Sequence, residues 1–348
     1  MRLERRENVS PLLAMALIVG AIIVAFLLSG IAIAWGGVSP LRAYTQIAIG
    51  SFGSRFAITE TLVRSVPLIF TGLAAAVAFR ARLWNIGADG QFFMGGLAVV
   101  LLGTGQLHLP GVILIPLLIF FAAILGAILL ILPTYMKTAF NADEVVTTLL
   151  LNFIVVLFVS MMLDGPLKDT MAMGWPRSMP VIADAHLPKI LSRSRLHLGF
   201  VLSIIAAVVI FILSTRTKWG FEMNAVGMNP EGARFLGLPV TRTLLLVACI
   251  SGGLAGMGGA IEVMGLRGSL TNDLSPGFGY TGIIVATLAG LNPLAVIPAA
   301  IFVAGIFVGS DAMSRVVGLS SFIAQVITAL SLICMLCASL LTQYRIRA

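Results

Sequence analysis

The sequence predicts an all-α polytopic integral membrane protein of about ten transmembrane helices, some of them short or discontinuous. Two observations predict this class. First, hydrophobic residues make up 59% of the 348 residues and charged residues only 10%, with a mean hydropathy of +1.06. A soluble domain is usually about 25% charged, so this chain has too few charges to cover a surface in water. Second, apolar stretches of spanning length recur along the whole chain.

Eight of these stretches are long enough to cross the hydrocarbon core, and two shorter ones carry glycine and resemble discontinuous helices. The first apolar run, Pro11–Ala34, is longer than the core of a signal peptide and is expected to be an uncleaved span. Counting all ten as crossings puts both termini on one side. The long stretches lie at 12–34, 61–79, 111–133, 144–163, 198–214, 242–262, 293–309 and 321–341, and the short ones at 89–104 and 281–290.

The net charge of +8 indicates a membrane surface rather than nucleic acid. The arginines lie at the ends of apolar runs, and no basic stripe with interleaved aromatic residues is present. A small majority of basic residues falls on the side expected to be cytoplasmic, which favours cytoplasmic termini. We expect a single membrane domain, 1–348, with a cytoplasmic tail at 1–10, an external proline-rich loop at 164–197 and a cytoplasmic segment at 217–242.

No motif for covalent chemistry is found. The chain lacks a phosphate-binding G-x-x-x-x-G-K-[ST] loop, an H-E-x-x-H motif and a G-x-S-x-G motif. Cys334 and Cys337 form a C-x-x-C inside an apolar run, where packing is the expected role, and all three histidines fall in predicted loops. We therefore expect no catalytic centre, no metal site and no cofactor bound by this chain.

Polar residues within the apolar segments are candidates for a substrate pathway. Asn85, Asp89 and Gln91 stand at the start of a short apolar run, where they either cap a helix or line a pore. Asn152 lies two turns inside a span, beyond the reach of a helix end, and needs a partner in the bundle. Glu262 follows a glycine-rich span and is expected either to be wet at its external end or to face a polar cavity.

Glycines in two segments predict a close helix contact and a break in the chain. Gly252 and Gly256 form a G-x-x-x-G pattern, which favours close helix packing in lipid. Gly227 and the Asn229-Pro230 pair are expected to break the chain before a short helix of about two turns, which ends at Gly237. A helix this short does not stabilise itself in water, so we expect it to pack on another protein rather than form an ordinary loop.

Four ordered motifs resemble the permease subunits of bacterial ABC importers. They are FRARLWNIGADGQ, DEVVTTLLLN, GMNPEGARFLGLPV and SGGLAGMGGAIEVMG, and the similarity, which covers roughly 60–340, is to the branch for simple sugars and, more closely, nucleosides and purines. That branch usually has glutamate where this chain has Asp89.

The resemblance implies a type II importer-like permease in a bacterial plasma membrane. It implies three protein partners: a second related permease, identical or paralogous, a cytoplasmic ATPase that binds ATP and magnesium, and an external solute-binding protein that delivers a small molecule. By this analogy 227–237 is the coupling helix seated in the ATPase. The residues that the analogy assigns to coupling are Gly227, Asn229, Glu231, Arg234 and Gly237.

Three other functions compete with this one. The same type of importer for a pentose or another simple sugar shares these motifs. An ion-coupled secondary transporter would use Asp89 and Glu262 as an ion site and would leave the short helix at 227–237 without a role. A membrane enzyme would need clustered nucleophiles or metal ligands, which the sequence does not show.

Overall fold

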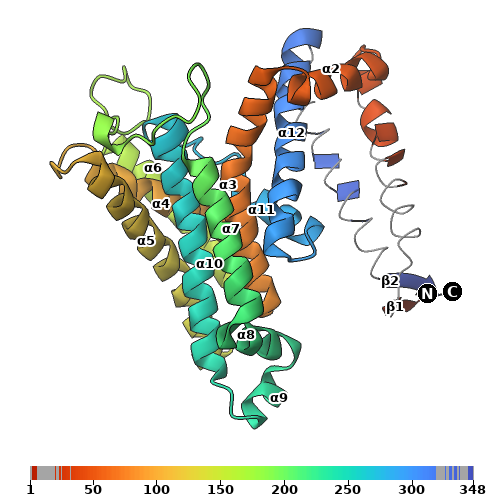
Figure 1. Cartoon of the computed structure of the whole chain (residues 1–348), viewed down its shortest axis with the longest axis vertical. Helices are drawn as coiled ribbons and strands as arrows, with labels where there is room; N and C mark the ends of the chain where they lie inside the picture. Colours follow the sequence, from red (N-terminus) through yellow and green to blue (C-terminus); the bar gives the residue numbers. More distant parts are fainter. Residues whose placement is uncertain are drawn as a thin grey trace. The chain divides into compact units, whose positions relative to one another are not determined.

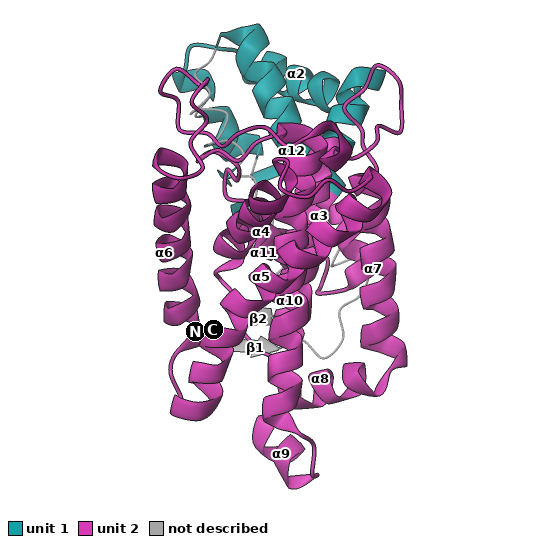
Figure 2. Ribbon diagram, turned by 90° about the vertical axis from the view of Figure 1, so that its left-hand side faces the viewer, with its two compact units in different colours: residues 1–62, 301–348 teal, residues 63–300 magenta. Residues whose placement is uncertain are grey.

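The computed structural model describes residues 33–318 continuously and, beyond them, residues 2–5, 20, 23–24, 26–31, 326, 329–330, 333–334, 337 and 344–347. Its contacts group the chain into two compact units (Figure 2). Unit 1 combines Met1–Leu62 with Ile301–Ala348, and unit 2 is Val63–Ala300. The candidate site residues all lie in unit 2.

The described elements are helices except for one pair of short strands (Figure 1). In chain order they are β1 Arg2–Arg5, α2 Pro40–Phe52, α3 Arg55–Arg80, α4 Ala88–Gly103, α5 Gly111–Phe140, α6 Glu144–Asp164, the 3₁₀ turn η1 Ala183–Ala185, α7 Gly199–Arg216, α8 Lys218–Met228, α9 Pro230–Phe235, α10 Val240–Glu262, the π-helical turn η2 Val263–Arg267, α11 Phe278–Leu288, α12 Pro293–Val317 and β2 Tyr344–Arg347.

Among the described residues, six helices are long and apolar enough to cross a membrane: α3, α5, α6, α7, α10 with η2, and α12. A bent pair, Phe26–Trp35 with α2, adds a seventh if it is counted as one span. α4 and α11 are shorter apolar helices, as the sequence predicted for 89–104 and 281–290. The prediction of ten spans is not confirmed, since the expected spans at 12–34 and 321–341 lie largely outside the described residues.

Unit 2 is built around α10, which packs mainly on α5 and α4. In the most apolar 18-residue stretch of α10 with η2, 72% is buried. In the corresponding stretches of α5, α6 and α7 only 28%, 22% and 28% are buried. These three helices therefore turn long apolar faces outward, which water does not solvate favourably and lipid does. The chain is a multi-pass membrane protein.

Glycines allow α10 to approach its neighbours at backbone distance. A Cβ atom on Gly252 would lie 2.4 Å from the carbonyl oxygen of Gly126 in α5, and one on Gly256 would lie 2.2 Å from that of Ala122. Any larger side chain would force the helices apart, because real Cβ contacts are not this short. Gly252 and Gly256 thus lie where a small-residue packing motif would place them, and Gly126 is the partner that sequence spacing alone did not reveal.

Unit 1 contains features that the sequence did not predict. α2 lies between the predicted spans at 12–34 and 61–79, where the sequence indicated no helix, and Pro40 begins it at the first helical position. Ser51 in α2 donates a hydrogen bond of 2.6 Å to the carbonyl oxygen of Gly305 in α12. β1 and β2 pair antiparallel, with Arg2 opposite Arg347, so the chain ends in unit 1 meet as a two-stranded ribbon.

Residues 217–242 fold differently from the prediction at one point. Gly227 was expected to break the chain, but it lies inside α8, which runs on to Met228. The helix needs glycine here because a Cβ at position 227 would lie 1.9 Å from the carbonyl oxygen of Arg80 at the end of α3. The break falls instead at Asn229, whose extended backbone separates α8 from α9.

Candidate functional site

Asn85 and Gln91 form a reciprocal amide pair at the start of α4. Each side chain donates to the other at 2.9 Å, and Asn85 also donates to the Ser251 hydroxyl at 3.2 Å. Ser251 in turn donates at 2.8 Å to the carbonyl oxygen of Ala74 in α3. All three side chains are buried, and the polar cluster Asn85–Gln91–Ser251 joins α3, α4 and α10 through these hydrogen bonds.

Asp89, another predicted pathway residue, lies against the N-terminus of α11. Its Oδ1 accepts from the Ser275 hydroxyl at 2.5 Å and from the Gly279 backbone N–H at 2.9 Å. Gly277, the residue before α11, has no side chain with which to cap the helix. A buried carboxylate from α4 therefore serves as the cap of a distant helix, where the positive end of the helix dipole favours negative charge.

Asn152 has the partner inside the bundle that the sequence required. Its amide nitrogen donates at 2.8 Å to the hydroxyl of Tyr280 in α11. Asn152 is buried, whereas Tyr280 keeps 39% of its surface exposed. Among the described residues, Oδ1 of Asn152 has no hydrogen-bond partner, and the small void beside it has no room for a water molecule. Tyr280 was missed in the sequence because a lone tyrosine in a short apolar run carries no pattern.

Glu262 is not wet at the end of its helix. It is 2% exposed at the last turn of α10, and its carboxylate lies 3.7 Å from Nε of Arg267. Arg64 and Arg195 also act on it electrostatically. Arg267 in turn reaches Asp273 at 3.3 Å. Of the basic residues that balance this buried carboxyl group, Arg64 and Arg195 lie far from it in sequence, which no local pattern predicted.

The short helix α9 projects from the end of unit 2 (Figure 2). Asn229 caps it, since its side-chain oxygen accepts from the N–H groups of Glu231 and Gly232, both at 3.0 Å. Gly237, in the left-handed region at φ +78°, follows its last turn. The tip is apolar and uncovered: Phe235 is 93% exposed and Leu236 75%.

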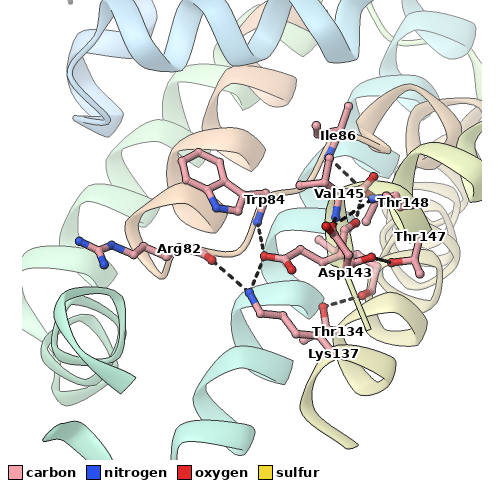
Figure 3. Close-up of polar contacts among 12 residues, drawn as sticks. Arg82, Trp84, Ile86, Thr134, Lys137, Asp143, Val145, Thr147 and Thr148 are labelled. Atoms are coloured by element: carbon pink, nitrogen blue, oxygen red, sulfur yellow. Dashed lines mark hydrogen bonds and ion pairs between the residues drawn. The ribbon is translucent and has the colours of Figure 1, made fainter. Parts of the chain in front are cut away.

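A groove of about 700 Å³ opens beside α9 between the ends of α3, α5, α6 and α10. Arg234 of α9 lines it together with Trp84, Lys137 and Glu144. Lys137 and Glu144 form an ion pair across the turn that joins α5 to α6. Lys137 also donates at 3.3 Å to the carbonyl oxygen of Arg82 (Figure 3). The predicted coupling residues and a charged groove therefore lie at one end of unit 2.

Metal-ligand clusters of three or more His, Cys, Asp or Glu side chains are not found among the described residues. Cys249, Cys334 and Cys337 are free thiols, so the C-x-x-C pair forms no disulfide.

The family model described as "branched-chain amino acid transport system / permease component" matches residues 57–342. The chain belongs to this permease family. It is 30% identical over 317 residues to the nucleoside ABC transporter permease NupB of Lactococcus lactis subsp. cremoris, with 89% of this permease and 87% of NupB covered. The guanosine ABC transporter permease NupP of Bacillus subtilis is 31% identical, with 92% and 90% covered.

A third relative is named for a different substrate. The glucose ABC transporter permease TsgB13 of Haloferax volcanii is 30% identical over 356 residues, with 99% of this permease and 93% of the relative covered. The permease is therefore a component of an ABC transporter, as the four sequence motifs predicted.

Proposed function

We propose that the permease imports nucleosides or purine bases, and that a separate ATPase docked at α9 supplies the energy. The apolar tip of α9 is the observation that supports docking of the ATPase. Phe235 and Leu236 are almost fully exposed at the end of a six-residue helix, which has too few backbone hydrogen bonds to stand alone. A tip of this kind is stable when a partner protein covers it.

The charges beside the tip suit a protein partner. Glu231 and Arg234 lie on the same short helix, so the tip presents apolar residues within a charged rim, the arrangement typical of interface cores. This end of unit 2 is then the cytoplasmic end, and the loop at 164–197 and the Glu262 cluster are external. Both chain termini are proposed to be cytoplasmic. A second related permease completes the pathway, and an external solute-binding protein delivers the substrate.

The mechanism follows from alternating access. ATP binding closes the ATPase pair, which displaces both coupling helices and rocks the two permeases between outward-facing and inward-facing states. This chain then needs no catalytic centre and no bound cofactor, since ATP and magnesium sit on the ATPase. Its own contribution is to hold the substrate weakly enough to release it, which hydrogen-bonding side chains achieve better than charged ones.

The nucleoside assignment rests on two supports. Two of the relatives named above transport nucleosides, by their names, and cover about nine-tenths of this permease. In addition, Tyr280 presents a half-exposed aromatic ring whose hydroxyl is held by Asn152, and a fixed ring of this kind stacks well on a planar base. The glucose relative favours the second candidate, an importer for a simple sugar.

The deciding experiment is ATP-dependent uptake by the complete transporter reconstituted in liposomes. Labelled guanosine is offered with an excess of unlabelled adenosine, ribose or glucose. We expect adenosine to compete and both sugars to leave uptake unchanged. Competition by a sugar without competition by adenosine would replace the nucleoside assignment with the sugar one. Uptake that needs a proton or sodium gradient and no ATP would show an ion-coupled carrier.

A further inference from the structure

Residues 81–87, here called the connector, join α3 to α4 without regular structure. Three side chains, one from the last turn of α5 and two from the first turns of α6, bind its backbone. Lys137 donates to the Arg82 carbonyl oxygen at 3.3 Å. The N–H groups of Trp84 and Ile86 donate to the side chains of Glu144, at 3.5 Å, and Thr148, at 3.3 Å (Figure 3). The connector is therefore held by side chains along its length.

The ion pair between Lys137 and Glu144 ties these contacts together. The same Glu144 oxygen that accepts from the connector also accepts from Lys137. The Glu144 side chain is only 10% exposed, so its charge is costly to keep without a basic partner. Removing either charge therefore weakens two contacts to the connector and not only the pair itself.

The second residue of the connector is strained. Arg82 has φ +51°, in the left-handed region where glycine is usual, and it lies two residues after the end of α3. Leu83 N–H bonds the carbonyl oxygen of Ala78 at 3.0 Å, which completes the tight reversal after the helix. Such a conformation persists only where its surroundings hold it, and the contact from Lys137 to the Arg82 carbonyl is part of that restraint.

One end of the connector lies next to α8, which leads to α9, and the other end belongs to the Asn85–Gln91–Ser251 cluster. Just before it, the Arg80 carbonyl lies against Gly227 of α8, so closely that no Cβ fits between them. At its far end, Asn85 belongs to the buried cluster with Gln91 and Ser251. α8 leads directly into α9 through Asn229. A continuous path of backbone and short side-chain contacts thus runs from α9 to the polar cluster.

We propose that Lys137 and Glu144 are positioning residues that make the connector transmit the displacement of α8 and α9 to the Asn85–Gln91–Ser251 cluster. The proposal deepens the function proposed above and rests on it. With the ion pair in place, the connector moves as one piece with α3 and the start of α6. Without it, the connector bends at Arg82, and movement of α9 no longer reaches the cluster.

The test measures the coupling ratio, the substrate taken up per ATP hydrolysed, in the complete transporter in liposomes. The variants are Lys137→Met, Glu144→Gln and the double variant. We expect each single variant to lower the ratio by about five-fold or more. The double variant is expected to be no worse than the more severe single one, since both remove the same restraint.

Two further variants separate positioning from general damage. Lys137→Arg keeps a donor for both Glu144 and the Arg82 carbonyl, and it is expected to retain at least half of the coupling ratio. Asp143→Asn is the matched control: it removes a neighbouring exposed carboxylate that caps α6 through the Val145 and Val146 N–H groups and does not touch the connector. Its coupling ratio is expected to equal that of the unmodified permease.

Three results would overturn the inference. The first is an unchanged coupling ratio in Lys137→Met and Glu144→Gln. The second is a loss of coupling ratio in Asp143→Asn that equals the loss in these two variants. The third is that size-exclusion chromatography shows the two variants losing assembled complex to the same extent as they lose coupling ratio. Failure of the proposed function is a separate outcome, because the unmodified transporter would then show no ATP-dependent uptake at all.

Discussion

Gly227 of α8 meets the backbone of Arg80 at the end of α3 at a distance that leaves no space for a side chain: a Cβ there would lie 1.9 Å from the Arg80 carbonyl oxygen. The contact is backbone against backbone, so neither partner relieves a clash by changing rotamer. It links the segment expected to couple to the ATPase with the rest of unit 2.

Gly227→Ala is therefore expected to destabilise the permease by about 1–3 kcal/mol, the usual cost of forcing an extra methyl group into a packed site. The measurement is the thermal unfolding midpoint of the purified protein in detergent. Gly232→Ala is the control, because a Cβ at position 232 has no neighbour closer than 3.4 Å. A stable Gly227→Ala variant would show that α8 does not pack on α3 as described.

The exposed tip of α9 carries the second prediction. Phe235→Glu places a charge on the surface proposed to be covered by the ATPase and is expected to weaken ATPase binding by at least about ten-fold. Binding is measured by pull-down of the ATPase on the immobilised permease. Met173→Glu is the matched control, since Met173 is just as exposed but lies in the loop at 164–197. Equal losses for both variants would contradict an interface at α9.

Asp89 provides the third prediction, because it caps α11 from a distance. Asp89→Ala leaves the Gly279 N–H and the Ser275 hydroxyl without their acceptor and is expected to cost about 1–2 kcal/mol, the range measured for lost helix caps. Asp89→Asn keeps an acceptor oxygen and is expected to cost less than Ala. The thermal unfolding midpoints rank the two variants, and a reversed order would show that the carboxylate serves another purpose.

His197 predicts a dependence of stability on pH. Burial lowers the pKa of its imidazole from 6.5 to about 4. Between these values the unfolded chain binds a proton at this position and the folded chain does not. The free energy of unfolding therefore falls as the pH drops from 6.5 towards 4, by about 3 kcal/mol at most, and is unaffected above pH 6.5.

The measurement for His197 is the unfolding midpoint in detergent across this pH range. His197→Asn keeps an acceptor for the Gly199 N–H, which bonds the His197 ring at 3.1 Å, and is expected to flatten the pH dependence. His108→Asn, at an exposed histidine, is expected to leave the dependence unchanged. A dependence that persists in His197→Asn would assign it to another group.

Much of the fold could be predicted because lipid leaves few alternatives for an apolar chain. The long apolar runs at 111–133 and 144–163 became α5 and α6, since every buried backbone group in a membrane needs a partner within the helix. α8 could not be predicted in this way. It is short and carries no long apolar run, and Gly227 looks like a breaker until the contact with Arg80 shows why the helix needs a glycine there.

The candidate site, too, could be predicted from the sequence only in part. The sequence singled out Asn85 and Gln91 as amides at the start of a short apolar run, and Asn152 as an amide inside a span that requires a partner. It could not name those partners, Ser251 and Tyr280, since they come from helices more than a hundred residues away. The same holds for the basic residues around Glu262, which are scattered along the chain.

The sequence by itself determined that this protein is a membrane permease of the ABC type, because composition and ordered motifs are properties of the chain that need no geometry. Only the tertiary structure decided which polar groups satisfy one another. It placed Lys137 and Glu144 around the connector and brought Gly227 onto Arg80. These contacts depend on where helices cross, and helix crossings are set by packing over the whole unit rather than by any local pattern.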